Sequence, residues 1–253
     1  MIVRVDKCST FGIKKVASKS VQYLPKLIIN NILVPCIKIG ESFKYLGRYF
    51  DFEMTNQSHT LDLSTAIEEM MSDIDQKPLH PKNKLLIYNR YVLSKISWHF
   101  TVADLSKTWV SETIGSLALH YIRKWLDLPV CGTLSNVFLL CNKFGLNIRP
   151  PSVKFTQCQT VQRQALKSSP NEEIKSLWSS TSVHTNIQYD ALKSTKDFIK
   201  KFQADQENKL GHGLLSQGFF FKHVINDSSP ELNKIWSSVQ SKLPKNIYNF
   251  TIR

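Results

Sequence analysis

The spacing of the apolar residues changes near residue 60, and this change limits the folds open to the chain. Up to residue 52 the apolar residues come in short runs, such as 26–29 and 32–34. These runs predict short β-strands, with Asn30 and Asn31 as a two-residue hairpin turn, because asparagine tolerates positive φ. From residue 60 the apolar residues recur with the period of an α-helix. We therefore expect an α+β fold that is mainly α, a small β-hairpin region followed by a helical bundle.

Helical periodicity continues over much of the chain. The segments predicted as helices are residues 60–77, 82–100, 108–126, 133–143, 158–169 and 195–210. Trp125 shares the apolar face of 108–126 with Ile114 and Ile122, so we predict that it belongs to the core and does not stack on bases. The rest of the C-terminal part is polar or Ser-rich between short aromatic clusters. These patterns predict three regions of the chain: residues 1–58, residues 59–167, and residues 168–253, which are expected to be only loosely helical.

The net charge of the chain is +13 and is unevenly distributed. Residues 1–50 hold nine Lys and Arg against two acidic residues, and residues 81–167 hold twelve against three. Residues 51–80, in contrast, hold one Lys against seven acidic residues. Two basic surfaces on either side of an acidic segment favour a polyanionic partner, of which nucleic acid is the natural candidate. The alternative is a solvated basic surface without a partner.

Several other classes of protein are disfavoured. No apolar run approaches the roughly 18 residues of a membrane span, and the N-terminus lacks a signal-peptide core. We therefore expect no membrane partner and an intracellular location, in the nucleus or the cytoplasm. The five cysteines include no CxxC pair, which disfavours a disulfide framework or a zinc ribbon.

Catalytic motifs are missing from the sequence. The phosphate-binding P-loop, the GxSxG elbow and the HExxH motif are all absent. The closest pair of aspartates, Asp73 and Asp75, is predicted to be a surface feature at the end of a helix. We predict no catalytic residue and no metal ligand in this chain.

One candidate binding segment is SFKYLGRYFDF, residues 42–52, which gathers five aromatic rings around Gly47. Rings offer flat faces for bases or sugars, and Lys44 and Arg48 offer partners for phosphates. Strand alternation places Phe43 and Tyr45 on one face, with Tyr49 as a further candidate for it. The alternative is a half-buried strand, which also favours aromatic residues.

The second candidate is a basic face on the helices of 82–100 and 108–126. Six cationic or titratable side chains lie off the apolar stripes: Arg90, Lys95, Lys107, His120, Arg123 and Lys124. A helical bundle with one basic face can follow a duplex by its phosphates without reading its sequence. The alternative is an ordinary helix surface, but such surfaces usually mix both signs of charge.

Five short motifs occur in a characteristic order. They are DKC (6–8), FKYLG (43–47), KPLHPKNKLLIYNRYVLSKISWHF (77–100), IRKWLDLP (122–129) and FGLNIRPPS (144–152). In this order they resemble the reverse transcriptase of non-LTR (LINE-type) retrotransposons, an RNA-directed DNA polymerase, over about residues 1–165. The matching part of that family is the end of the palm and the thumb. The resemblance thus implies a palm remnant in 1–58 and a helical thumb in 59–167.

The resemblance also implies roles for particular residues. Lys7 matches a lysine that lies near the pyrophosphate of the incoming nucleotide. The segment that matches the primer grip, a hairpin that holds the 3′ end of the primer, consists of Phe43, Lys44, Tyr45, Leu46 and Gly47. The two helices match the thumb, which lies along the template–primer duplex, and Arg123 and Lys124 match phosphate contacts of the thumb.

The catalytic centre of this family is not found in the sequence. The polymerase reaction uses two Mg²⁺ ions held by aspartates, which in this family lie in a palm strand and an Ala-Asp-Asp turn upstream of the matched part. No Asp-Asp dipeptide occurs in the chain. We therefore expect a fragment, truncated or decayed, that has no cofactor of its own and binds RNA or an RNA–DNA duplex without sequence specificity. Its other partner would be the missing fingers and palm. The alternative is a helical protein-interaction module, or a decayed element without a nucleic-acid role.

Overall fold

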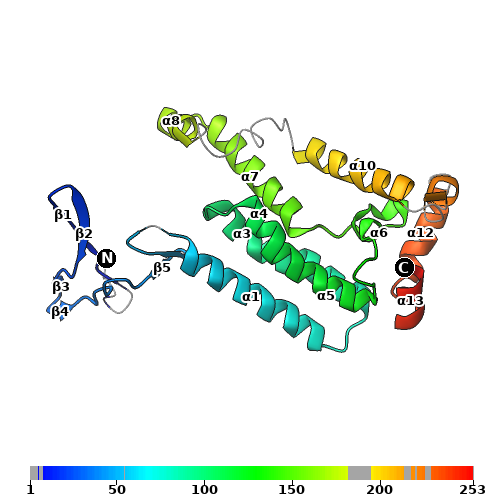
Figure 1. Cartoon of the computed structure of the whole chain (residues 1–253), viewed down its shortest axis with the longest axis horizontal. Coiled ribbons are helices and arrows are strands. Elements are labelled where there is room, and N and C mark those ends of the chain that lie inside the picture. The colour runs from blue at the N-terminus through cyan, green and yellow to red at the C-terminus, as the bar shows by residue number, and fades with distance from the viewer. Residues whose placement is uncertain are drawn as a thin grey trace. The chain divides into compact units, whose positions relative to one another are not determined.

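The computed structural model describes residues 5, 8–53, 55–181, 195–213, 218–219, 221–225 and 229–252. The chain forms two compact units, Met1–Leu63 and Ser64–Arg253 (Figure 1). The first unit holds small antiparallel strand pairs and the second is built from helices. The prediction of an α+β fold that is mainly α is confirmed. The predicted regions 59–167 and 168–253 both fall almost entirely within the second unit.

The described strands of the first unit form three hairpins. They are β1 (Gly12–Val16) with β2 (Lys19–Tyr23), β3 (Ile28–Ile29) with β4 (Ile32–Leu33), and β5 (Phe43–Tyr45) with β6 (Arg48–Phe50). Asn30 and Asn31 have φ of 49° and 60°, which confirms the predicted two-residue turn. The β1–β2 hairpin was not predicted, and its turn places Ala17 at a φ of 54°.

The core of the first unit is small. Val34 is 1% exposed, and the buried Gln22 side chain donates hydrogen bonds to the backbone carbonyls of Ile37 and Lys38. The hairpins leave a large apolar surface in contact with solvent. Its exposed side chains are Ile13, Val16, Val21, Tyr23, Leu24, Leu27, Ile28, Ile32, Leu33 and Ile39.

The second unit contains most of the helices. Its first half contains α1 (Gln57–Gln76), which begins in the first unit, α2 (Pro81–Ile87), η2 (Tyr88–Val92) and α3 (Leu93–Val102), then α4 (Lys107–Trp109), η3 (Val110–Gly115) and α5 (Ser116–Leu126). The elements that follow are α6 (Ser135–Phe138), η4 (Cys141–Lys143), α7 (Pro151–Lys167), α8 (Glu172–Thr181), α10 (Thr195–Gly213), η5 (Phe221–Ile225), α12 (Pro230–Val239) and α13 (Lys245–Ile252). The helix predicted over 133–143 is shorter than expected, because α6 ends at Phe138.

Two of the predicted helices contain a π-helical turn, η2 and η3. The buried positions 88, 92, 96 and 100 of one helix, and 110, 114, 118, 122 and 126 of the other, recur every four residues. In a regular α-helix of 3.6 residues per turn such a spacing drifts by about 40° at each step. A wider turn accommodates an additional residue and reduces this drift. The apolar stripe can therefore stay against the core along the whole length of each helix.

The core of the second unit lies between α3, α5 and α7. Helices α3 and α7 pack side by side (Figure 1), with the Phe100 and Phe155 rings edge to face at 5.5 Å. The Gln159 side chain donates to the Phe100 carbonyl at 2.6 Å. These contacts hold α7 against the predicted thumb helices.

The last helix is fixed onto the same core, although the sequence predicted only a loosely helical region there. His80 caps α2 by accepting from the Lys82 amide at Nδ1, and its Nε2 bonds the Leu243 carbonyl at 3.0 Å. The Asn249 side chain donates to the Trp125 carbonyl at 3.3 Å and to the Asp127 carboxylate at 2.7 Å. Helix α13 is thus attached to the start of α2 and to the end of α5.

Candidate nucleic-acid interface

The hairpin that was predicted to resemble a primer grip is formed by β5 and β6. Leu46 and Gly47 make its turn with φ of 48° and 83°, as a tight two-residue hairpin requires. Phe43 pairs with Phe50, and their rings lie 5.7 Å apart. The Phe11 ring lies 5.8 Å from that of Phe43, so the inner rings hold the base of the hairpin.

The tip of the hairpin is open to solvent. Tyr45 is 61% exposed and Leu46 is 71% exposed. Tyr49 was a candidate for the face of Phe43 and Tyr45, but it pairs with Lys44 on the opposite face. The tip therefore offers one ring and one aliphatic side chain.

The cations of the hairpin are engaged within their own unit. The Lys44 Nζ lies 3.5 Å from the Asp62 carboxylate and 4.8 Å from the Tyr49 ring centroid. Arg48 donates to the Asn56 side chain at 3.0 Å. The Lys44 pair is largely exposed, and such pairs contribute little, so a phosphate can replace Asp62 at small cost. Lys7 lies outside the described residues.

A second surface runs along the outside of α2, η2 and α3. Its members share exposure to solvent and lie on one side of the continuous helix: Asn83, Leu86, Arg90, Tyr91, Ser94, Lys95 and Trp98. We call this set the outer strip. Tyr91 is 54% exposed and Trp98 is 51% exposed. The Lys95 Nζ lies 5.8 Å from the centroid of the Tyr91 ring.

The charge of the outer strip has a single sign. Residues 81–103 contain no Asp and no Glu. Within the described part of the chain, Arg90 makes no hydrogen bond and no ion pair. The strip therefore combines cations that are not committed to a carboxylate with two exposed rings, which is the combination that nucleic-acid surfaces use.

Sequence reasoning found the cations of the outer strip but missed its rings. Tyr91 and Trp98 are seven residues apart, which is almost two full turns, so they share one side of the helix. Both lie off the predicted apolar stripe of 82–100. An aromatic residue outside the core stripe, next to cations, was the signal that could have identified them.

The predicted phosphate contacts on α5 have other partners in the structure. Arg123 donates to the carbonyls of Pro129 and Gly132 at 2.6 and 2.8 Å, which closes the loop after the helix. Lys124 is exposed, and its Nζ lies 2.6 Å from the Asp75 carboxylate. Their role in binding phosphates stays a prediction, and Arg90 and Lys95 are better placed for it.

Asp75 connects three elements and is more than the surface feature predicted at the end of α1. Its carboxylate accepts from the Trp125 indole Nε1 at 2.9 Å and from Lys124, and it lies 3.8 Å from the Lys84 Nζ. The hydrogen bond from Lys124 is the main reason why the pKa of Asp75 is lowered. The pKa of Lys84 is lowered as well, mainly by burial. Trp125 is 3% exposed, which confirms the prediction that it belongs to the core.

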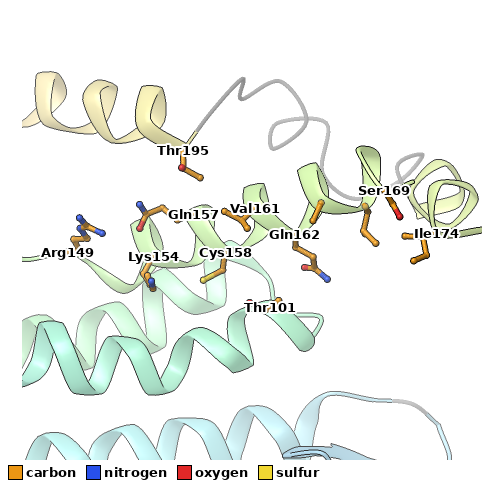
Figure 2. A pocket seen from close by; sticks show the side chains of 12 residues that line it. Thr101, Arg149, Lys154, Gln157, Cys158, Val161, Gln162, Ser169, Ile174 and Thr195 are labelled. Atoms are coloured by element: carbon orange, nitrogen blue, oxygen red, sulfur yellow. The ribbon is translucent and has the colours of Figure 1, made fainter. Parts of the chain in front are cut away.

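Among the described residues of the second unit, two cavities bear on a possible binding site. The larger, about 750 Å³, follows α7 and is shown in Figure 2, where Arg149 and Lys154 lie toward one end and Ile174 toward the other. The smaller, about 280 Å³, lies between α2 with η2, residues 141–148 and the last two helices, and shares Asn83, Leu86 and Arg90 with the outer strip.

The described residues offer neither a metal site nor a membrane-spanning helix. No group of three His, Cys, Asp or Glu side chains converges there as a metal site would require. None of the helices in that part of the chain has both the length and the apolar character needed to cross a bilayer. Comparison with known proteins finds no family model that matches the sequence and no curated protein that resembles it significantly.

Proposed function

We propose that the chain binds RNA and RNA–DNA duplexes without sequence preference, as the late-palm and thumb part of a non-LTR reverse transcriptase. The observation that carries this proposal is the outer strip. Arg90 and Lys95 stand there beside two exposed rings, on a helical segment without any acidic residue. A surface of this kind binds the phosphate backbone, which has the same charge in every sequence.

The dimensions of the outer strip suit a nucleic-acid backbone. Arg90 and Lys95 are five residues apart, or about 7.5 Å along the helix axis, so they can contact different phosphates. Tyr91 and Trp98 are about 10 Å apart on the same axis, so each ring can stack on a separate unpaired base. The strip therefore supports contacts with a duplex and with its single-stranded extension.

The hairpin of β5 and β6 provides a second contact in this proposal. Its exposed tip, Tyr45 and Leu46, would press on the sugar-phosphate backbone of a strand end, and Lys44 would contact a phosphate. The tight two-residue turn at Leu46 and Gly47 supports this role, because a short turn has few conformations to lose on binding.

The proposed activity is binding and not synthesis. Polymerisation needs aspartates that hold two Mg²⁺ ions, and the sequence has no Asp-Asp pair. In the intact family those ions would activate the primer hydroxyl.

One observation favours a second candidate function, the docking of another protein. The hairpins of the first unit expose many large apolar side chains, among them Ile28, Ile32 and Leu33. Exposed apolar surface of this kind marks interaction sites. The two candidates respond differently to salt, because phosphate binding weakens steeply with ionic strength and apolar docking does not.

The proposal is tested by neutralising the two cations of the outer strip. Each phosphate contact contributes a slope of about 0.7–0.9 in log affinity against log salt. We therefore expect the full-length variant Arg90→Gln/Lys95→Gln to lose about 1.4–1.8 from that slope. At about 0.1 M salt this corresponds to a roughly 25–60-fold weaker complex with several unrelated RNA–DNA duplexes.

The matched control is Lys200→Gln/Lys201→Gln, which removes the same charge from exposed positions on α10. It should leave the slope nearly unchanged. The proposal is wrong if both double variants weaken binding equally, or if neither alters the salt dependence.

A further inference from the structure

The cavity between α2 and the last two helices contains an unusual polar group. Tyr248 lines this cavity of about 280 Å³ and is completely buried. Its hydroxyl has no hydrogen-bond partner among the described residues. A buried hydroxyl without a partner costs free energy, and native proteins rarely retain one unless a water or a ligand completes it.

The lining of the cavity indicates which ligand fits. Arg90 and Lys82 bring two positive charges to the lining, and Asp and Glu are absent from it. Asn83 and Gln240 add amide groups that can both donate and accept, and Leu86 adds apolar surface. Cations suit a phosphate, amides suit the edge of a base, and an apolar wall suits a sugar or the face of a base.

The size and position of the cavity further narrow the choice of ligand. A volume of 280 Å³ is about the volume of nine molecules of liquid water. A cavity of this size admits one nucleotide-sized group and excludes a base pair within a duplex. Arg90 lines the cavity and also belongs to the outer strip. A strand bound along the strip would therefore reach the cavity with its end.

We infer that this cavity binds the terminal, phosphate-bearing nucleotide of a nucleic-acid strand, with the Tyr248 hydroxyl as a hydrogen-bond donor and Arg90 and Lys82 as phosphate partners. This inference rests on the proposed function, because it assigns a strand end to the surface that binds the strand. Burial raises the pKa of Tyr248, which keeps the hydroxyl protonated and able to donate.

The test uses the full-length protein and single-stranded 12-nucleotide RNAs that carry a 5′ phosphate, a 3′ phosphate or no terminal phosphate. We expect one of the phosphorylated RNAs to bind at least tenfold more tightly than the unphosphorylated RNA. Adenosine monophosphate should also raise the melting temperature of the protein, and inorganic phosphate should raise it less.

Two variants test whether the preference for a terminal phosphate arises in the cavity. Tyr248→Phe removes only the hydroxyl, so the free protein should melt at the same or a higher temperature, while the tenfold preference for a terminal phosphate falls to about twofold. Asn83→Asp places a negative charge in the exposed part of the lining and should abolish the preference without changing the fold. The matched control is Tyr88→Phe, because the equally buried Tyr88 hydroxyl donates to the Arg149 carbonyl outside the cavity. It should lower the melting temperature and keep the preference.

The outcomes separate the inference from the proposed function. If none of the RNAs binds, the proposed function is wrong and the inference is lost with it. If the RNAs bind but a terminal phosphate gives no preference, or if Tyr248→Phe keeps the full preference, only the inference is overturned. An equal effect of inorganic phosphate and adenosine monophosphate would reduce the cavity to a phosphate site and overturn its assignment to a nucleotide.

Discussion

The contact between Asp75 and Trp125 offers a quantitative test of the helical core. Asp75→Ala would leave the buried Trp125 indole N–H without its acceptor, which costs about 1–3 kcal/mol. Lys84 would keep its hydrogen bond to the backbone carbonyl of residue 75 but lose its carboxylate partner. We therefore expect a loss of about 2–3 kcal/mol in the free energy of unfolding. For a chain of this size, that lowers the melting temperature by roughly 4–12 °C.

The hydrogen bond itself is isolated by a double-mutant cycle of Asp75→Ala and Trp125→Phe, followed by thermal unfolding. The phenylalanine keeps most of the packing and removes only the indole donor. A hydrogen bond to a charged acceptor predicts a coupling energy of about 1.5–3 kcal/mol. A coupling below about 0.5 kcal/mol would show that the contact adds nothing to packing, and would refute the reasoning.

The pH dependence of the same variants gives an independent check. The folded-state pKa of Asp75 lies below its ordinary value of 3.8, so the carboxylate contributes its stability above that value. This contribution is lost as the pH falls through the lowered pKa of the folded state. The original protein should therefore lose stability below about pH 4, and Asp75→Ala should lose less over the same interval. Parallel pH profiles for the two proteins would contradict the assignment.

Two further predictions concern the fold and the activity. Gly145→Ala should destabilise the protein strongly, because a Cβ there would collide with the backbone carbonyl of Leu139. Thermal unfolding checks this, with Gly115→Ala as the control, because a Cβ at Gly115 meets only the Val110 carbonyl at an ordinary 3.5 Å and neither glycine has a positive φ. The purified chain should not extend a primed template with any divalent metal, because the sequence has no Asp-Asp pair; templated extension by protein free of contaminating polymerase would disprove this.

Local signals were sufficient for much of the fold. The turn at Asn30 and Asn31 depends on residues that tolerate positive φ and was predicted from the sequence. The turn at Leu46 and Gly47 places a leucine at a φ of 48°, which its residue type alone does not indicate. The long helices were predictable because one apolar stripe repeats along each of them. Helix α12 was missed although Ser229 and Pro230 form a typical start signal, and although Leu232, Ile235, Trp236 and Val239 recur with the period of a helix.

Contacts between distant residues could not be predicted. Asp75 and Trp125 are 50 positions apart, and His80 and Leu243 are 163 positions apart. Nothing in the local sequence of Asp75 distinguishes a solvated carboxylate from one that accepts a buried indole. The candidate site likewise has one part that local sequence predicts and one part that depends on contacts between distant residues. The cations of the outer strip were found from composition, whereas the cavity beside Tyr248 depends on helices brought together by the fold.

The two π-helical turns have a consequence at the level of the gene. Each wide turn holds one residue more than a regular helix needs, so an in-frame deletion of a single codon within Tyr88–Val92 would restore the α-helical pitch there. Because the wide turn absorbs that residue, the later positions of the helix would keep nearly their present sides, and Trp98 would stay on its own side. The same three-nucleotide deletion in a regular α-helical turn would rotate every later position by about 100°. The two π-helical turns are therefore places where these helices can lose a residue without exchanging their solvent-facing and inward-facing sides.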